Sequence, residues 1–420
     1  MIDKGALREI LIDNRKMVAN MKVIRRDVAL RDELRYVFVG VRRAGKSFLM
    51  FQRMQDLLAK GKSWNDMLYI NFEDDRLYGF DIHDFDTILT VHKEMGGQDP
   101  ILFLDEVQNI EGWEKFARRL ADHKYMVYIT GSNAKMLSSD VATTLGGRYV
   151  VKNVFPYGWD EYLNANGIDK DDLFFEEDTR ERLLDEYVRQ GGFPECAAYQ
   201  EKKDYLFSLY QKIFLGDIAM RNKVENPNAL RLMFIKMAES VKQPIALTRL
   251  ANIINSVGTK VSKNTVINYA GYAKDSFLIF PIKNFADNFT ERETNQKYYF
   301  IDNGIIDLLT FDCLTSQLEN VVALTLMRWY GIDDRVYFYN YNVEVDFVIP
   351  EKEMAIQVCY TLGDEGSDTF NRETKSLVTL AKRFPYKKLL IVTYNEEKTI
   401  YVNDTEIEVV PLWKWMLPKC

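Results

Sequence analysis

YVFVGVRRAGKSFLM, residues 36–50, is the stretch that decides the fold of the N-terminal part of the chain. Its first four residues are apolar, as in a buried strand, and an apolar pattern with helical spacing follows from Ser47 to Leu58. Between them, Gly40–Ser47 matches the pattern G-x-x-x-x-G-K-[ST], which requires a strand before it and a helix after it. Because both flanks are present, the stretch predicts a strand, a phosphate-binding loop (P-loop) and a helix.

The chemistry of this loop predicts a site for ATP with Mg²⁺. Glycines let backbone N–H groups converge on phosphate oxygens, and the following helix directs its positive end at them. Lys46 would place a charge on the β- and γ-phosphates, and Ser47 would hold Mg²⁺. The residues predicted to bind the nucleotide are Gly40, Val41, Arg42, Arg43, Ala44, Gly45, Lys46, Ser47 and Phe48.

Two adjacent acids end a second apolar strand, Ile101–Leu104. Asp105 is predicted to orient Mg²⁺ through its water, and Glu106 to polarise the attacking water. A second acid beside the metal ligand is suited to act as a base, which favours hydrolysis over nucleotide storage. The sequence therefore predicts Lys46 and Glu106 as catalytic, and Ser47 and Asp105 as metal ligands.

Two further candidates come from shorter patterns. The strand Met126–Ile129 runs into polar residues, of which Ser132 or Asn133 could sense the γ-phosphate; the alternative is an ordinary strand-to-helix turn. Arg148 follows two glycines and could reach a γ-phosphate in its own or a neighbouring subunit. A surface arginine is an equally good interpretation.

Composition limits the class of protein. The 420 residues suffice for two or three domains, and 62 acidic against 55 basic residues give a net charge of −7, which argues against nonspecific coating of nucleic acid. The four cysteines and three histidines show no paired spacing for a metal site or a disulfide framework. No long uncharged apolar run and no signal-peptide pattern is present, so we expect a cytoplasmic protein.

The chain is predicted to be α/β with several domains. Strands at 36–39, 67–72, 101–104 and 126–129 alternate with helical stretches, which predicts a parallel sheet with helices on both faces. A largely helical part follows, and then a short helix, a turn at Gly258 and a helix capped by Ser262, a winged-helix pattern. Strands alternate with helices again toward the end. The predicted domains are 1–160 (ATPase), 161–235 (helical lid or linker), 236–295 (winged helix) and 296–420 (α/β).

Residues 241–275 are locally basic in an acidic protein. Five Lys and Arg residues stand against one acid, Asp275, and Ser262–Thr265 begin the second helix, where such modules place their DNA-contacting groups. DNA contact is one interpretation, and packing or subunit contact is the other. The basic residues are Lys242, Arg249, Lys260, Lys263 and Lys274.

Nearly the whole chain resembles the AAA-type P-loop ATPases of bacteria and archaea that carry a C-terminal domain of restriction-endonuclease-like fold. The resemblance implies ATP binding and hydrolysis, with Arg148 as a candidate finger and the Gly-Gly-Phe-Pro turn near the nucleotide, and it implies no substrate. It rests on the P-loop and on Asn71–Asp74, Leu104–Gln108, Thr130–Ser132, Gly147–Arg148, Gly191–Glu195 and Tyr299–Gly304.

The last domain departs from the nuclease pattern that it resembles. Such cores gather Mg²⁺ with a strand-borne Asp and a Glu-x-Lys on the next strand. Here Asp346 is present and Glu319 would add an acid, but Gln357 replaces the second strand's acid and Cys359 replaces the lysine. An amide binds Mg²⁺ weakly and a thiol supplies no fixed positive charge. The sequence predicts an inactive nuclease-like domain.

Three functional hypotheses remain open. The first is a Mg²⁺-dependent ATPase whose cycle controls the winged-helix and nuclease-like parts, with DNA, a protein or a second copy as partner. The second is a nucleotide-gated scaffold for DNA or protein with little hydrolysis. The third, an active nuclease regulated by ATP, depends on a site that the sequence has lost.

Overall fold

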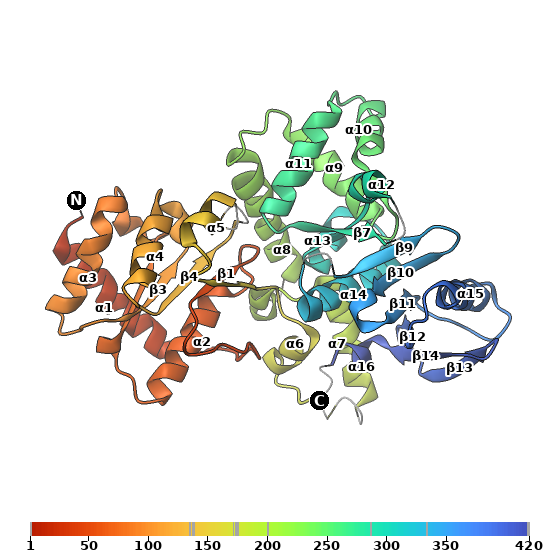
Figure 1. Cartoon of the computed structure of the whole chain (residues 1–420), viewed down its shortest axis with the longest axis horizontal. Coiled ribbons are helices and arrows are strands. Elements are labelled where there is room, and N and C mark those ends of the chain that lie inside the picture. The colour runs from red at the N-terminus through yellow and green to blue at the C-terminus, as the bar shows by residue number, and fades with distance from the viewer. Residues whose placement is uncertain are drawn as a thin grey trace. The chain divides into compact units, whose positions relative to one another are not determined.

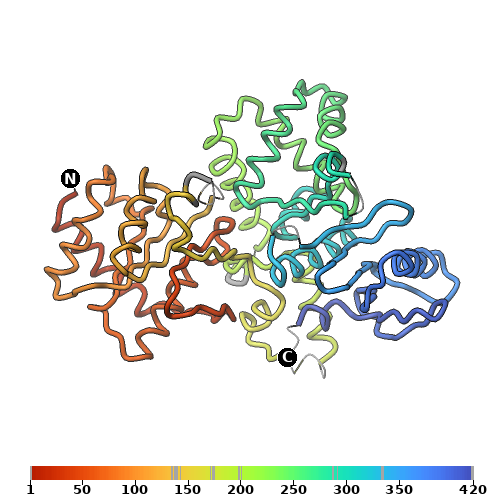
Figure 2. Tube along the Cα trace, viewed as in Figure 1, coloured from red at the N-terminus to blue at the C-terminus, as the bar shows by residue number. Residues whose placement is uncertain are grey.

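The computed structural model describes residues 2–133, 136, 139–170, 172, 176–199, 201–285, 288–332 and 335–417. Contacts divide the chain into two compact units (Figures 1 and 2). The first unit holds Met1–Phe155 and Asp275–Phe277, and the second holds Pro156–Lys274 and Leu278–Cys420. Each unit has its own sheet, so each is described by itself.

The first unit is built on a five-stranded parallel sheet with the order β2-β3-β4-β1-β5. Strands β1 to β4 are apolar and buried, as strands covered on both faces must be. The parallel α/β fold and these four strands are confirmed, and the exposed edge strand β5 was not predicted. The strands are β1 Tyr36–Val39, β2 Met67–Asn71, β3 Ile101–Asp105, β4 Val127–Gly131 and β5 Val150–Asn153.

Helices cover both faces of this sheet (Figure 1). Val37 and Val39 pack into a core shared with α1, α3 and α4, while Tyr36 and Phe38 alternate onto the opposite face. On that face α2 contributes Arg53, whose Nε donates to the Tyr128 hydroxyl at 2.8 Å. The helices are α1 Lys4–Asn20, α2 Lys46–Ala59, α3 Phe85–Glu94, α4 Trp113–Asp122 and α5 Ser139–Leu145.

The second unit begins with helices, as expected for residues 161–235. A π-helical segment, Lys212–Met220, continues directly from α8. Ser262 caps α11 by accepting a hydrogen bond from the Thr265 N–H at 3.0 Å, as predicted. The helices are α6 Trp159–Ala165, α7 Glu177–Gln190, α8 Lys202–Gln211, α9 Pro227–Glu239, α10 Leu247–Ser256, α11 Lys263–Asp275, α12 Phe289–Thr294, α13 Asn303–Leu309, α14 Leu314–Tyr330, α15 Asp368–Arg383 and α16 Leu412–Trp415.

One nine-stranded sheet runs through the rest of this unit, in the order β13-β14-β12-β11-β10-β9-β7-β8-β6. It crosses the expected domain boundary at residue 295, because β7 pairs with both β8 and β9. The Asn284 side chain extends that junction, donating to the Asn340 carbonyl at 2.9 Å. The strands are β6 Ile245–Ala246, β7 Ile279–Asn284, β8 Asn295–Phe300, β9 Tyr337–Asn340, β10 Glu344–Ile349, β11 Met354–Val358, β12 Lys388–Thr393, β13 Lys398–Val402 and β14 Thr405–Pro411.

Two of the sequence motifs, Gly191–Glu195 and Tyr299–Gly304, meet inside the second unit. The buried Asp302 carboxylate accepts the N–H of Gly192 at 2.7 Å and the N–H of Gly304 at 2.8 Å. Gly191 has a φ of 78°, and a Cβ there would lie 1.8 Å from Asp302 Oδ1. The two motifs are therefore joined by a buried, hydrogen-bonded contact. A role for the Gly-Gly-Phe-Pro turn near the nucleotide stays a prediction.

Candidate nucleotide site

The P-loop connects the end of β1 to the start of α2. Gly45 at the N-cap has a φ of 93° and gives no side-chain cap, so the first turn of α2 keeps its N–H groups for another acceptor. A Cβ at Gly40 would lie 2.1 Å from the Val154 carbonyl oxygen, which excludes any larger residue. The loop thus has the backbone of an anion site.

Other side chains of the predicted loop have ordinary packing or pairing roles. Val41 and Ala44 are fully buried, and Arg42 pairs with Glu73 at 3.1 Å. Phe48 packs its half-exposed ring on Phe51.

Lys46 is buried and held at the centre of the site. Its Nζ donates to the carbonyl oxygens of Gly40 and Val41, each at 3.2 Å. The same Nζ lies 3.5 Å from Glu106 Oε1. The ammonium group is therefore placed between the loop and the acids, where a phosphate group would compete for it.

Asp105 ends β3 in a fully buried position. Its carboxylate accepts hydrogen bonds from the Thr130 hydroxyl and, at 2.7 Å, from the Tyr69 hydroxyl. Burial and the neighbouring Glu106 raise the pKa of Asp105, and hydrogen bonds that include one from Ser47 offset part of that rise. Ser47 and Asp105, the two predicted metal ligands, therefore lie side by side.

Glu106 lies in the left-handed region, with a φ of 51°. Gln108 Nε2 donates to its Oε2 at 2.6 Å. Burial raises the pKa of Glu106, but the charge of Lys46, the Gln108 hydrogen bond and the charge of Arg42 together outweigh burial and lower it. The carboxylate is therefore ionised and able to accept a proton.

Sequence reasoning missed two residues of this site, Thr130 and Gln108. The Thr130 hydroxyl donates to Asp105 and accepts the Glu106 N–H at 2.9 Å, so it fixes both acids from the neighbouring strand β4. Both residues lie inside motifs named from the sequence, Leu104–Gln108 and Thr130–Ser132. A hydroxyl or amide side chain at the end of a strand was the feature that could have marked them as site residues. Their partners depend on how strands pair, which local spacing does not give.

The weaker candidates lie at different places in the first unit. Asn133 is buried just after β4 and follows the buried Ser132. Arg148 binds Asp122, with Nε 2.7 Å from Oδ1, and donates to the carbonyls of Leu145 and Gly146. Among the described contacts none joins Arg148 to residues 40–48. The sensor and finger roles therefore stay predictions.

The donors present fit a Mg²⁺ ion shared with phosphate oxygens. Mg²⁺ is usually held by one or two protein oxygens plus substrate phosphates, and Ser47 and Asp105 provide that set. Within the described ranges no group of three or more His, Cys, Asp or Glu residues forms a metal site. Nor does any helix of the described chain have the length and apolar character needed to cross a membrane.

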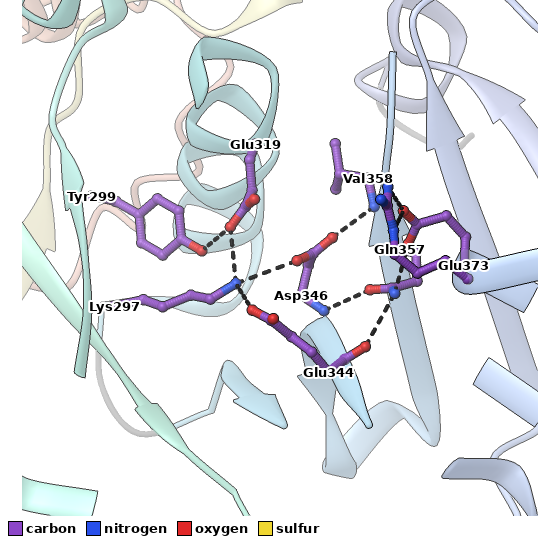
Figure 3. A network of polar contacts seen from close by, with 9 residues as sticks. Lys297, Tyr299, Glu319, Glu344, Asp346, Gln357, Val358 and Glu373 are labelled. Atoms are coloured by element: carbon purple, nitrogen blue, oxygen red, sulfur yellow. Dashed lines mark hydrogen bonds and ion pairs between the residues drawn. The ribbon is translucent and has the colours of Figure 1, made fainter. Parts of the chain in front are cut away.

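The acids predicted in the last domain form a second polar cluster (Figure 3). Glu319 on α14 and Asp346 on β10 come together, and Gln357 on β11 contacts Asp346. Cys359 supplies no cation, as expected. A cation comes instead from Lys297 on β8, which sequence reasoning missed because residue 297 lies far from the expected strand pair.

Two family models match separate parts of the chain. Residues 33–163 match a family described as AAA domain, and residues 181–312 match a domain of unknown function (DUF8612). The Walker-type ATPase PABY2304 of Pyrococcus abyssi is similar over 74% of this chain and 96% of that one, with 14% identity and a TM-score of 0.41. That similarity is too low to support an inference about function.

Two relatives match over almost their whole length. The uncharacterized protein MJ1544 of Methanocaldococcus jannaschii is 32% identical, over 99% of this chain and 96% of its own. An uncharacterized protein of Haemophilus influenzae is 30% identical, over 91% of this chain and 94% of its own. The chain therefore belongs to the family of these two proteins, and residues 33–163 form an AAA-type P-loop domain.

Proposed function

We propose that the chain is a Mg²⁺-dependent ATPase with Glu106 as the catalytic base. The observation that carries the proposal is the grouping of an ionised Glu106, 3.5 Å from Lys46, with Asp105 and Ser47 beside it. A site that only binds and stores a nucleotide needs the lysine and the phosphate-binding loop, but no second acid. An ionised second acid is needed only where a water is activated.

Each side chain has one task in this mechanism. The uncapped N-terminus of α2 binds phosphate oxygens, and Lys46 leaves the carbonyls of Gly40 and Val41 to pair with the β- and γ-phosphates. Ser47 and Asp105 would hold the metal ion, which would neutralise charge on the phosphates. Glu106 accepts the proton of the attacking water, and Thr130 keeps both acids in place.

Glu106→Gln tests the base directly. The amide keeps the size of the side chain but accepts no proton, so ATP should bind with unchanged affinity while turnover falls by about 100-fold or more. Glu114→Gln, the same change in the first turn of α4, is the matched control and should keep the wild-type rate. A Glu106→Gln protein that hydrolyses ATP normally would show that Glu106 is not the base.

We further propose that the nucleotide cycle acts on two modules of the second unit. The order α9, β6, α10, α11, β7, β8, with β8 antiparallel to both β6 and β7, supports a winged helix. The order α14, β9, β10, β11, α15, β12, with only the β11–β12 pair parallel, supports a nuclease-like core.

A specific observation favours DNA as a partner of the winged helix. All five basic side chains of residues 241–275 are exposed, and among the described residues none of the five forms an ion pair. Lys242 donates to the Thr315 hydroxyl at 3.0 Å, and the other four are Arg249, Lys260, Lys263 and Lys274. Unpaired cations on one small module suit phosphate contact. The rival is a nucleotide-gated scaffold, and the steady-state ATPase rate with and without DNA separates the two.

The nuclease-like core is proposed to be inactive. Gln357 uses its amide to hold neighbouring groups, with Oε1 accepting the Asp346 N–H at 2.8 Å and Nε2 donating to Glu373 at 2.8 Å. We expect purified protein with Mg²⁺ or Mn²⁺ to cut neither DNA nor RNA. Cutting that Asp346→Ala abolishes would overturn this part of the proposal.

A further inference from the structure

A lysine lies at the centre of the acid cluster in the second unit (Figure 3). The side chain of Lys297 is 0% exposed, a position that lysine occupies only when it is paired. Its Nζ lies 3.2 Å from Glu319 Oε1, 3.2 Å from Glu344 Oε1 and 3.3 Å from Asp346 Oδ1. Three carboxylates from α14 and β10 thus converge on one ammonium group of β8.

Other donors fix two of these three carboxylates. The Tyr299 hydroxyl donates to Glu319 Oε1 at 2.7 Å, and the Val358 N–H donates to Asp346 Oδ2 at 2.9 Å. Gln357 ties β10 to β11 by accepting the Asp346 N–H, and its Nε2 also donates to the Glu344 carbonyl at 3.1 Å. The carboxylates of Glu319 and Asp346 are therefore held by the fold as well as by the lysine. The carboxylate of Glu344 is half-exposed, and the lysine is its described partner.

The lysine keeps its charge in this position. Burial lowers the pKa of Lys297, but attraction to Glu319, Asp346 and Glu344 outweighs burial and raises it above the ordinary value. The pKa of Glu319 is raised to about 7, mainly by burial, and the lysine charge offsets part of that rise. One positive charge thus stands among three acids, where a cation is required.

We propose that Lys297 is a resident cation that fills the position where these three carboxylates would otherwise gather a divalent metal ion. Carboxylate oxygens converging on one point are the ligands that hard cations select. As they stand around the ammonium group, the three acids do not themselves form a metal site, and no other group of three or more His, Cys, Asp or Glu among the described residues does. A metal ion would be held only once the ammonium group is gone and the carboxylates close in on the position it leaves. The proposal concerns the second unit alone and does not depend on ATP hydrolysis.

Replacing the lysine should convert the cluster into a metal site. Lys297→Ala removes the ammonium group and leaves the carboxylates around a small cavity. The probe is Tb³⁺ added to nucleotide-free protein and excited through tyrosine, because the Tyr299 hydroxyl contacts Glu319 and would lie beside the bound ion. We expect Lys297→Ala to gain luminescence that wild type lacks, and Ca²⁺ to raise its unfolding temperature.

Three further variants separate this result from adventitious binding. Lys297→Arg keeps the charge and should gain no luminescence, and Lys297→Ala combined with Asp346→Asn should lose the gain. A folded Lys297→Ala protein without Asp346-dependent luminescence overturns the proposal. If Lys297→Ala does not fold, Tb³⁺ luminescence is compared between wild type and Asp346→Asn. Equal luminescence in the two proteins supports a cluster without a metal ion. A wild-type signal that is absent from Asp346→Asn overturns the proposal.

Discussion

Single side chains set the chemistry of the nucleotide site. Glu106 is held on one side by Lys46 and on the other by Gln108, and both contacts lower its pKa. A carboxylate with fixed neighbours keeps one orientation toward a water, which is what a general base requires. In the proposed mechanism, Gln108 is therefore a positioning residue that acts through Glu106.

Gln108→Ala should lower kcat by about tenfold and leave KM unchanged, because the base loses its orientation while the phosphate contacts remain. The lost hydrogen bond had lowered the pKa of Glu106, so the acid limb of the pH–kcat profile should move to higher pH. Gln98→Ala, the same substitution at an exposed glutamine, is the control. A changed KM at constant kcat would contradict the positioning role.

Gly191 is the residue on which the contact between the two motifs of the second unit depends. Gly191→Ala brings a Cβ to 1.8 Å from Asp302 Oδ1, so it should displace a buried, hydrogen-bonded carboxylate. Gly331→Ala is a matched control, because its φ of 94° and ψ of 167° lie in the same glycine-favouring region as the 78° and −164° of Gly191, and nothing lies within 4 Å of its Cβ.

In thermal unfolding, we expect Gly331→Ala to cost about 1–3 kcal/mol, from backbone strain alone, and Gly191→Ala to cost at least about 2 kcal/mol more. The difference between the two variants measures the packing of the glycine on Asp302. Equal losses would show that this contact contributes nothing to stability.

At the scale of elements, helix α11 is the element that would contact DNA in the proposed winged helix. It begins at Lys263, capped by Ser262, and its first residues Lys263 and Asn264 are exposed. The N-terminal end of such a helix carries the contacts of winged and helix-turn-helix modules. Its exposed lysines are therefore the residues to change.

Lys263→Ala should weaken binding to duplex DNA and reduce the slope of log K against log salt concentration by about 1, since one phosphate contact is lost. Fluorescence anisotropy at several salt concentrations measures both. Lys352→Ala, an exposed lysine on another element of the same unit, should leave affinity and slope unchanged. Identical slopes for all three proteins would favour packing or subunit contact over DNA.

At the scale of the whole molecule, the open question is whether one chain forms a complete active site. Arg148 binds Asp122 and two carbonyls of its own unit, and no described contact joins it to the P-loop. To act as a finger, Arg148 would have to leave these partners, and the γ-phosphate that it reaches would belong either to another copy or to its own chain. We expect the first, because assembly supplies fingers in trans to many P-loop proteins.

The specific ATPase activity should then rise with protein concentration. Mixing Glu106→Gln with Arg148→Ala should restore activity that each variant lacks, because one copy supplies the base and the other the arginine. A wild-type rate that does not change with concentration, together with no complementation, would exclude action in trans.

The sequence by itself determined what is local. The P-loop, the acid pair at the end of β3 and the first four strands of the sheet are contiguous patterns, and strand or helix periodicity within a few residues suffices to predict them. The same holds for α10, Gly258 and the cap of α11. Such features depend on neighbours in sequence, so no tertiary information is needed.

Tertiary structure decided the contacts that join distant residues. Thr130 reaches Asp105 because β3 and β4 pair, Asp302 holds Gly192 across 110 residues, and Lys297 meets Asp346 because β7 and β8 extend the sheet of β9 and β10. The spacing of residues along the sequence does not give the order of strands in a sheet. The position of Lys297 among the acids could therefore not be predicted from the sequence. In the last domain, the motif has Cys359 where a lysine is expected, and the cation beside the acids comes instead from Lys297 on β8.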